Sequence, residues 1–386
     1  MSRGPGRDEL VTRCGRTQAL MEAMGLDLLL ATTEPEVRYL TGFRTPFWQS
    51  PTRPWFVLLP LRGAPHAVIP AIGEVCMERC YTASIRSWPS PAPEDEGVTL
   101  LAATINELVS GRCRVGLAMG PETHLRMPLG DFATLKALLP GVIWRDATRI
   151  WRQLRMVKSE REIACIREAG QRTCDAFEAL GAYLEPGLSE IEIFRRMRIE
   201  ALQAGVDDVP YLVGGAGRGG YGDIISLPTS RPVGTGDVLV LDVGATFDGY
   251  HCDFDRNFAV GQPDAAVSEA YRQVHEALDA GLEAVRPGAS CADLHRVMST
   301  VLRGRGGGRD AGNVGRLGHG IGMQLTEWPS ITDTDDTVLE VGMVLALEPG
   351  LVFSGDRAMV HEENIVVRDQ GAELLTRRAP PVIPVI

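Results

Sequence analysis

The first 150 residues alternate short apolar runs with segments of helical periodicity. The apolar runs predict buried strands at residues 27–33, 54–61, 65–71 and 114–119. Apolar positions three and four apart predict helices at residues 15–25 and 96–112. Strands interleaved with helices are typical of an α/β domain, which we expect to end near Leu154.

A new helix start follows this point. Ser159 and Glu162 form the S-x-x-E capping box that opens a long helix. A chain of 386 residues is too long for one ordinary hydrophobic core. We therefore predict two domains, residues 1–154 and residues 155–386.

The second part contains an internal repeat of local pattern. Residues 184–197 and 285–298 each read as a Pro-Gly turn, a small polar cap and an amphipathic helix. Pro186 and Pro287 lie 101 residues apart. Glycine-rich chain and strands follow each copy, which predicts a domain of two similar α+β halves.

A predicted hairpin carries an unusual set of carboxylates. Two β-rich runs flank Asp248 and Gly249, a strong two-residue turn signal. With that turn, Asp242 faces Asp255, and Asp253 lies on the same face of the hairpin. A solvated acidic face is one interpretation. The strand around Asp242 is apolar on both sides, however, so burial beside a divalent cation fits better.

Three further potential ligands interrupt apolar or glycine-rich runs downstream. His319 stands between glycines, Glu348 ends one apolar run, and Glu362 interrupts another. Together with Asp242 and Asp253 they make four carboxylates and one imidazole. This oxygen-rich set suits two divalent ions of Mn, Co, Fe or Zn, which would activate a water and polarise a carbonyl.

The order D-x-G, D, G-H-G-I-G, E-P-G, E resembles the pita-bread metallopeptidases, which include prolidase, Xaa-Pro aminopeptidase, methionine aminopeptidase and creatinase. The intervals of 11, 29 and 14 residues are similar to those of prolidase-like members. Residues 34–43 resemble the creatinase-type amino-terminal domain. The resemblance implies an α+β fold: a duplicated pita-bread catalytic domain at 155–386 behind a creatinase-like α/β domain at 1–154. It also implies a homodimer in which the first domain helps to close the partner's site.

Two departures affect the expected chemistry. The family's two substrate-binding histidines are replaced by Ile225 and Thr326. In addition, Asp255 stands where the family has threonine. Loss of one such hydrogen-bond donor typically lowers turnover about 100- to 1000-fold.

The resemblance implies that Glu348 shuttles a proton, and Asp255 is a candidate base. Thr326 and His251 are candidate replacement donors, because His251 shares the parity of Asp253 in the hairpin. His361 should point the other way on a regular strand.

Three functions follow as hypotheses. The leading one is a dinuclear metal-dependent hydrolase that cleaves an amide bond in an Xaa-Pro dipeptide or a small non-peptide substrate. The alternatives are a metal-dependent lyase on the same fold, like the dimethylsulfoniopropionate lyases, and a non-catalytic binding protein that kept the pocket.

The composition limits which classes of partner we expect. A net charge of −11 argues against nucleic acid, and no run of about 18 uncharged apolar residues predicts a membrane span. The first 20 residues lack the apolar core of a signal peptide, so we expect a cytoplasmic protein. The eight cysteines show no paired metal spacing, and we expect reduced thiols.

Two further segments lead to expectations about local structure. Gly215, Gly217 and Gly220 match G-x-G-x-x-G, but the strand-like residues 221–228 follow instead of the helix that a dinucleotide site requires. Residues 45–55 cluster aromatic side chains, as either a packed hairpin or a lid that reaches a neighbouring subunit's pocket.

Overall fold

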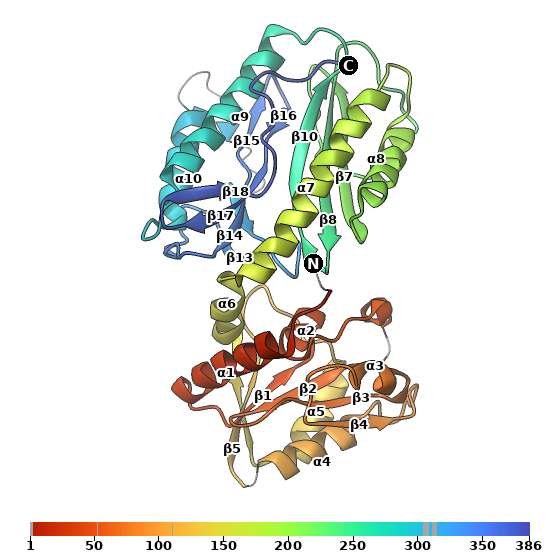
Figure 1. Ribbon diagram of the computed structural model, residues 1–386, viewed down its shortest axis with the longest axis vertical. Coiled ribbons are helices and arrows are strands. Elements are labelled where there is room, and N and C mark those ends of the chain that lie inside the picture. The colour runs from red at the N-terminus through yellow and green to blue at the C-terminus, as the bar shows by residue number, and fades with distance from the viewer. Residues whose placement is uncertain (1–2, 52, 110, 304–308, 311–314) are drawn as a thin grey trace. The chain divides into compact units, whose positions relative to one another are not determined.

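The computed structural model describes residues 3–51, 53–109, 111–303, 309–310 and 315–386. The chain divides into two compact units, the first ending at Leu154 and the second beginning at Arg155. Both units are traced in Figure 1.

Unit 1 is built on one mixed sheet. Its strands are β1 (Leu28–Ala31), β2 (Phe56–Pro60), β3 (His66–Pro70), β4 (Ser84–Trp88), β5 (Cys113–Leu117) and β6 (Val142–Asp146). The strand order is β4-β3-β2-β1-β5-β6, with β1 antiparallel to β2 and parallel to β5. Every residue of β1 is buried, which explains why its sequence is an unbroken apolar run and does not alternate.

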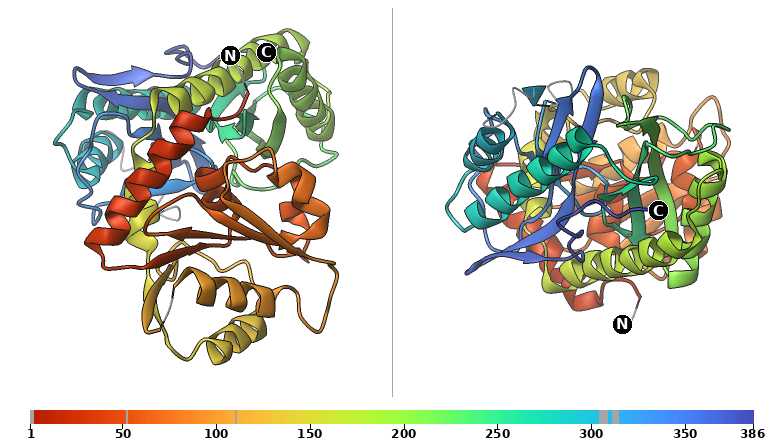
Figure 2. Two further views of the ribbon diagram at one scale, coloured as in Figure 1. Left: turned by 60° about the horizontal axis from the view of Figure 1, so that its bottom comes forward. Right: turned by 90° about the horizontal axis from the view of Figure 1, so that it is seen from above.

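Helices cover both faces of this sheet. The helical segments of residues 1–156 are α1 (Arg7–Ala23), α2 (Glu34–Thr41), η1 (Pro46–Gln49), η2 (Ala71–Gly73), α3 (Glu74–Met77), α4 (Val98–Leu108), α5 (Leu129–Leu138) and α6 (Thr148–Met156), the last of which ends in unit 2. Side chains of α4 and α5 share a buried cluster with Leu28, Leu30 and Val115 of the sheet. In Figure 2, α1 lies on the opposite face.

The aromatic segment of unit 1 is packed, but it does not form a hairpin. Phe43 and Trp55 lie 4.9 Å apart between ring centroids, and Trp48 lies 6.0 Å from Trp55. Arg126 donates to the carbonyl oxygens of Trp48 and Ser50, so the loop is tied down within its own unit. A reach toward a neighbouring subunit remains a prediction, and Thr52 lies outside the described residues.

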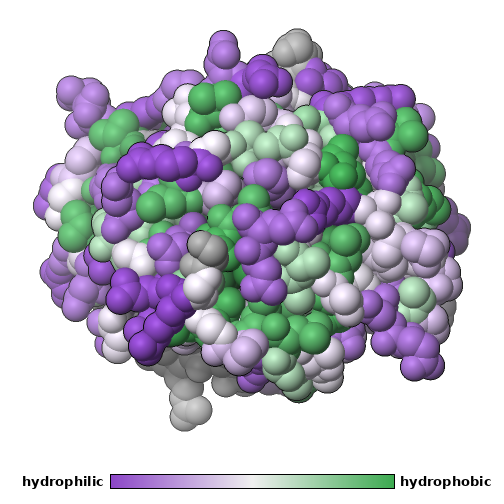
Figure 3. All heavy atoms as spheres, turned by 90° about the horizontal axis from the view of Figure 1, so that it is seen from below, coloured by the Kyte–Doolittle hydropathy of each residue, from purple (hydrophilic) through white to green (hydrophobic). Residues whose placement is uncertain are grey.

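The surface of unit 1 exposes scattered hydrophobic side chains. Leu129, Val75 and Ile72 are 82%, 64% and 61% exposed. Figure 3 shows hydrophobic groups of small size interspersed with hydrophilic side chains over the face seen from below. Singly exposed apolar residues are ordinary on protein surfaces and imply no partner.

Unit 2 combines two helix pairs with three sheets. Its helices are α7 (Glu160–Tyr183), α8 (Glu190–Ala204), α9 (Ala265–Ala284) and α10 (Cys291–Arg303). Its strands are β7 (Asp208–Arg218), β8 (Asp237–Phe247), β9 (Tyr250–His251), β10 (Phe254–Ala259), β11 (Arg309–Asp310), β12 (Gly318–Gly320), β13 (Glu327–Ser330), β14 (Val344–Leu347), β15 (Gly350–Phe353), β16 (Arg357–Val360), β17 (Glu363–Arg368) and β18 (Gly371–Leu374). The sheet orders are β10-β8-β7, β11-β15-β16 and β13-β12-β14-β17-β18, with β9 paired to β8.

The two halves of unit 2 repeat one local structure, as the sequence pattern predicts. Gly187 and Gly288 adopt φ of 99° and 91° in the turns before α8 and α10, a conformation that favours glycine. Ser189 and Ser290 then cap the two helices, each accepting from the backbone N–H three residues on. In Figure 1 the pairs α7 with α8 and α9 with α10 lie against different strands.

The predicted hairpin register is confirmed. Asp242 pairs with Asp255, and Thr246 pairs with His251 across β8, β9 and β10. Asp248 and its neighbour Gly249 adopt φ of 48° and 69°, the two positive values of a type I′ turn. This turn therefore determines which carboxylates share a face.

One predicted strand is wrong. Residues 221–228 form a loop, because Gly219 and Gly220 turn the chain at φ of 67° and 134° and Asp223 accepts from the backbone N–H of Ile225 at 2.9 Å. The run at 359–367 is interrupted at Glu362, as expected: β16 ends at Val360 and β17 begins at Glu363, with His361 and Glu362 between them. The glycine motif is still followed by a loop and no helix, so it is not a dinucleotide site.

Among the described residues, the helices include none that combines the length and the apolar character needed to cross a membrane.

The hairpin turn supplies a stability prediction. Gly249→Ala should lower the thermal midpoint, since alanine at φ of 69° is strained by about 1 kcal/mol or more. Gly15→Ala in α1 should raise it, because no atom lies within 4 Å of the added Cβ and alanine favours helix. Thermal scans of both variants check this, and a midpoint for Gly249→Ala at or above that of the parent contradicts it.

Candidate metal centre

Three predicted ligands converge in unit 2. Asp253, His319 and Glu362 each offer one ligand atom, and these atoms all lie within 4.8 Å of one another. His319 Nε2 is 3.4 Å from Asp253 Oδ2. All three side chains are buried. They come from the residue before β10, from β12 and from the junction of β16 and β17, which are far apart in the sequence.

Glycines on either side of His319 let its strand pack closely. A Cβ at Gly318 would lie 2.2 Å from the carbonyl oxygen of Ala346, and one at Gly320 would lie 2.1 Å from that of Trp328. The imidazole Nδ1 donates to the Gly320 carbonyl oxygen at 2.9 Å. A carbonyl only accepts, so Nδ1 carries the proton and Nε2 presents its lone pair toward Asp253.

Asp242 and Glu348, the other two predicted ligands, interact electrostatically with this group. Asp242 lies in β8, and Glu348 follows β14. Burial raises the pKa of Asp242 well above its usual value, and the carboxylates of Asp253 and Glu348 raise it further. Burial likewise raises the pKa of Glu362, and Asp253 and Glu348 add to the effect. These shifts mean that the carboxylates repel one another at short range.

The residues fit a divalent cation. Asp242 Oδ1 and Glu362 Oε1 are buried and have no hydrogen-bond partner among the described residues. Buried carboxylate oxygens without donors are costly, whereas a cation would pair with them directly. Burial lowers the pKa of His319, which favours the neutral imidazole that a metal requires.

Two residues at this site were missed in the sequence. Arg316 lowers the pKa of Asp253 and of Glu348, against the stronger effect of burial, so its positive charge lies beside the carboxylates. The hydroxyl of Tyr211 hydrogen-bonds to Asp242. An arginine three residues before His319 and a tyrosine in a strand are individually common. Only the three-dimensional arrangement distinguishes them from surface and core residues.

Asp255 and His361 form a buried pair next to the ligands. Asp255 is 1% exposed, and its Oδ1 accepts from the backbone N–H of Glu362 at 3.2 Å. His361 Nδ1 lies 3.6 Å from the same oxygen, and its ring stacks on His275 at 5.5 Å. His361 lies between β16 and β17, so the regular-strand alternation used to orient it does not apply. The contacts of Asp255 are those of a group that positions the chain at Glu362.

The other candidate donors differ in burial and in contacts. Thr326 is exposed, and its hydroxyl accepts from Arg316 at 3.4 Å. His251 faces Thr246 in the hairpin and donates its backbone N–H to the Gly322 carbonyl. Ile225, at a family histidine position, is 72% exposed in its loop.

A buried ion cluster supports the strand next to His319. Glu327 in β13 contacts Arg155 at 2.5 Å and Lys158 at 3.4 Å, all three side chains being nearly inaccessible. Burial alone would raise the pKa of Glu327, but the two cations lower it to about 2. The backbone N–H of Gln324 also donates to this carboxylate, so the cluster fixes the turn that precedes β13.

Unit 2 is a duplicated α+β unit that carries a buried set of acidic and imidazole ligands, and it follows an α/β unit in the chain. This combination defines a metallohydrolase. The model of metallopeptidase family M24 matches residues 164–369, and that of the creatinase/prolidase N-terminal domain matches residues 13–157. The chain therefore belongs to the M24 metallopeptidase family, whose members use divalent metal ions. The predicted family and fold class are confirmed.

Individual relatives and solved structures are consistent with membership in this family. A probable dipeptidase PepE of Mycobacterium tuberculosis is 30% identical over 362 residues, covering 90% of this chain and 89% of the relative. The crystal structure of dipeptidase PepE from Mycobacterium ulcerans is 27% identical with a TM-score of 0.81, covering 98% of each chain. A prolidase from Thermococcus sibiricus shares the fold, with 24% identity, a TM-score of 0.87 and coverage of 99% and 100%.

The buried ion cluster gives a second stability prediction. Glu327→Gln should destabilise unit 2 by about 3–5 kcal/mol, because it leaves Arg155 and Lys158 buried without their counterion. Since the folded pKa lies below the usual value of 4.5, the contribution of Glu327 is present above that pH and is lost as pH falls toward about 2. Urea unfolding at pH 7 measures the effect. A loss no larger than that of the surface control Glu269→Gln contradicts it.

Asp255 gives a pH prediction for the metal-free protein. Burial raises its pKa to about 7, against opposing effects of Arg256 and the Glu362 amide. The folded protein therefore binds more protons than the unfolded chain between about pH 4 and 7, so stability falls as pH rises through that window. Asp255→Asn should remove up to about 1.4 kcal/mol per pH unit of this slope. Unfolding series from pH 4 to 8 in chelator measure it, with Asp336→Asn as exposed control; equal slopes in all three proteins contradict it.

Proposed function

We propose that the protein is a dinuclear metal-dependent peptidase that cleaves the amide bond of Xaa-Pro dipeptides or of a closely related small amide. One observation carries the proposal: ligand atoms of Asp253, His319 and Glu362 lie within 4.8 Å of one another in a buried setting. The name of the mycobacterial relatives, dipeptidase, supports the substrate class. Membership in M24 supports metal-dependent peptide hydrolysis in general.

The proposed ligands are those of the sequence analysis: Asp242, Asp253, His319, Glu348 and Glu362. Two divalent ions bound there would supply Lewis acidity and lower the pKa of a water to near neutrality. Mn, Co, Fe and Zn all suit this mixture of carboxylate oxygens and one imidazole nitrogen.

Glu348 is the proposed proton carrier. Burial raises its pKa, while His319 and Arg316 lower it, so the carboxyl can take up and release a proton. Glu348 is less enclosed than Glu362 or Asp253, which leaves it accessible to a substrate. Arg316 would offset part of the negative charge around it.

The site lacks two hydrogen-bond donors that an ordinary prolidase offers to its substrate. Ile225 and Thr326 occupy the positions of the family's two substrate-binding histidines, and both are exposed. We therefore expect slow turnover on Xaa-Pro dipeptides or a preference for a smaller amide. We do not extend the proposal to elimination, because Asp255, the candidate base, is buried and already accepts from the Glu362 amide.

The activity of the metal-loaded protein tests the proposed metal dependence. Protein supplied with Mn, Co or Zn should hydrolyse a panel of Xaa-Pro dipeptides, and chelator should abolish the activity. His319→Ala should reduce kcat/KM by at least about 1000-fold, because it removes the single imidazole ligand. The matched control is His124→Ala, an exposed histidine of unit 1. Absence of turnover above background with every metal and dipeptide contradicts the proposal.

Restoring the missing donors provides an independent test. The double variant Ile225→His/Thr326→His should raise kcat/KM on Xaa-Pro dipeptides by about 100-fold or more, since one transition-state donor is worth about that factor. The exchange Ile225→Asn/Thr326→Asn controls for loss of the parent side chains. An unchanged or lower kcat/KM for the histidine variant means that these positions no longer face the substrate.

A further inference from the structure

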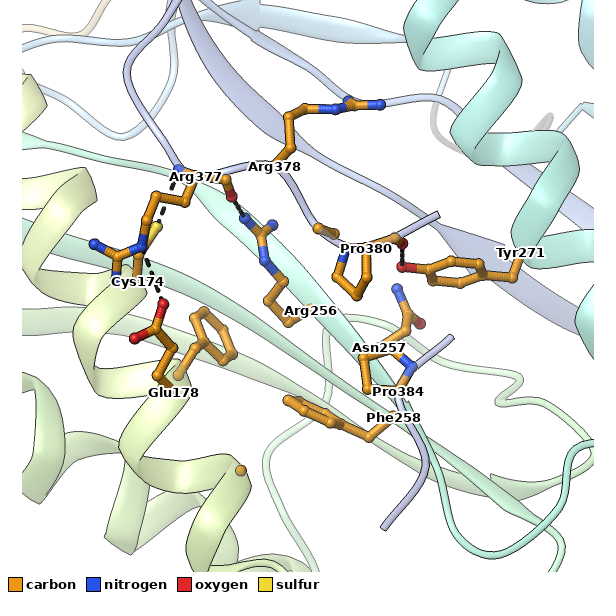
Figure 4. A pocket seen from close by; sticks show the side chains of 13 residues that line it. Cys174, Glu178, Arg256, Asn257, Phe258, Tyr271, Arg377, Arg378, Pro380 and Pro384 are labelled. Atoms are coloured by element: carbon orange, nitrogen blue, oxygen red, sulfur yellow. Dashed lines mark hydrogen bonds and ion pairs between the residues drawn. The ribbon is translucent and has the colours of Figure 1, made fainter. Parts of the chain in front are cut away.

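Unit 2 contains a pocket of about 250 Å³ whose lining includes none of the proposed metal ligands. Four segments contribute to it: α7, β10, the start of α9 and the C-terminal residues 377–384 (Figure 4). Phe177 and Gly181 of α7 and Phe258 of β10 are among its lining residues. Its size suits a metabolite rather than a peptide.

The lining has two chemical characters. Its basic lining residues are Arg256, Arg377 and Arg378, and among the described residues Glu178 is the one acidic residue that lines it. Its apolar side is made by aromatic rings and by two prolines of the C-terminal segment, Pro380 and Pro384. Such a lining suits a molecule with an anionic group on a compact apolar body.

Arg256 is the central cation in Figure 4. It is 9% exposed, and its Nη1 donates to the carbonyl oxygens of Asp255 at 2.6 Å and Glu362 at 3.3 Å. Its Nη2 donates to Glu363 Oε2 at 3.2 Å and to the carbonyl oxygen of Arg377. Its Nε–H donates to no described residue. A guanidinium that is nine-tenths buried thus retains one N–H for an acceptor in the pocket it lines.

The other two arginines are only weakly neutralised. Arg377 pairs with Asp175 at 2.7 Å and with Glu178 at 3.2 Å, and Arg378 pairs with Asp279 at 2.5 Å. The three carboxylate side chains are 59%, 74% and 48% exposed. Exposed ion pairs contribute little and exchange readily with solvent, so these carboxylates can give way to a bound anion.

We propose that this pocket binds a small organic anion, a carboxylate or phosphate monoester carried on a compact apolar group. The anionic oxygens accept from the Nε–H of Arg256 in the field of Arg377 and Arg378. The apolar group packs against Phe177 and Phe258.

Arg256 also connects the pocket to the metal centre. The same guanidinium donates to the carbonyl oxygen of Glu362, one of the proposed ligands. An anion that draws on Arg256 therefore acts on the backbone that carries Glu362. This coupling rests on the proposed function, whereas binding of the anion does not.

Calorimetry on the manganese-loaded full chain tests binding, with benzoate and phenyl phosphate as probes and benzyl alcohol as the neutral analogue. Gly181→Leu fills the pocket, because nothing lies within 4 Å of a Cβ at this position, and it leaves every arginine in place. Gly15→Leu is the matched control, a helical glycine of α1 with equally open space. At least one anion should bind the parent and Gly15→Leu equally, and bind Gly181→Leu at least tenfold more weakly. Benzyl alcohol should also bind the parent at least tenfold more weakly.

Three results overturn the site. The first is that neither anion binds. The second is that the anion binds Gly181→Leu as tightly as the parent, which a probe bound to the metal ions would also do. The third is that benzyl alcohol binds as tightly as benzoate. Binding of benzoate alone indicates a carboxylate ligand, and binding of phenyl phosphate alone indicates a phosphate ligand. Binding of both indicates that the pocket accepts either group.

Manganese affinity with and without the bound probe tests the coupling. It should change at least threefold in the parent and in Gly15→Leu and stay constant in Gly181→Leu, because coupling between sites is reciprocal. Anion binding without this change overturns the coupling. Failure of the protein to bind manganese at all counts against the proposed function, and calorimetry with the same probes on the metal-free full chain then tests the anion site on its own.

Discussion

Mutual repulsion among buried carboxylates is the constraint on which the site depends. Asp242, Asp253, Glu348 and Glu362 all have pKa values raised by burial, and neighbouring carboxylates raise each of them further. Such a group is unfavourable unless protons or cations neutralise it. The fold nevertheless holds these side chains together, and Arg316 is the nearby cation whose charge partly compensates them. This arrangement is expected of a protein that binds divalent metal ions as part of its folded state.

The surrounding structure explains how the repelling groups stay in place. The type I′ turn sets the register that brings Asp242 opposite Asp255. Asp255 in turn accepts from the amide of Glu362, which fixes that ligand from the neighbouring strand. The Glu327 cluster with Arg155 and Lys158 secures β13, which pairs with the strand of His319. Each support uses backbone hydrogen bonds or buried charge outside the ligand set, so the ligands remain available to a cation.

Local signals in the sequence were sufficient for much of this architecture. The hairpin, the capping boxes and the buried strands follow from patterns a few residues long, and the ligand order follows from the family resemblance. The strand-like pattern of residues 221–228 does not give a strand, because an Asx turn at Asp223 bends the chain and leaves Ile225 exposed. The orientation of His361 depended on strand regularity that ends at Val360. Arg316 and Tyr211 act through contacts between distant segments, which no local pattern encodes.

The most direct test of the account is the number and location of bound metal ions. In crystals grown with Mn²⁺, anomalous difference maps should show two peaks per chain, enclosed by the carboxylates of Asp242, Asp253, Glu348 and Glu362 and the imidazole of His319. Elemental analysis of the same preparation should give two equivalents. A centre with no anomalous peak, or with manganese bound only elsewhere on the chain, would contradict the claim that these five residues form the catalytic metal site.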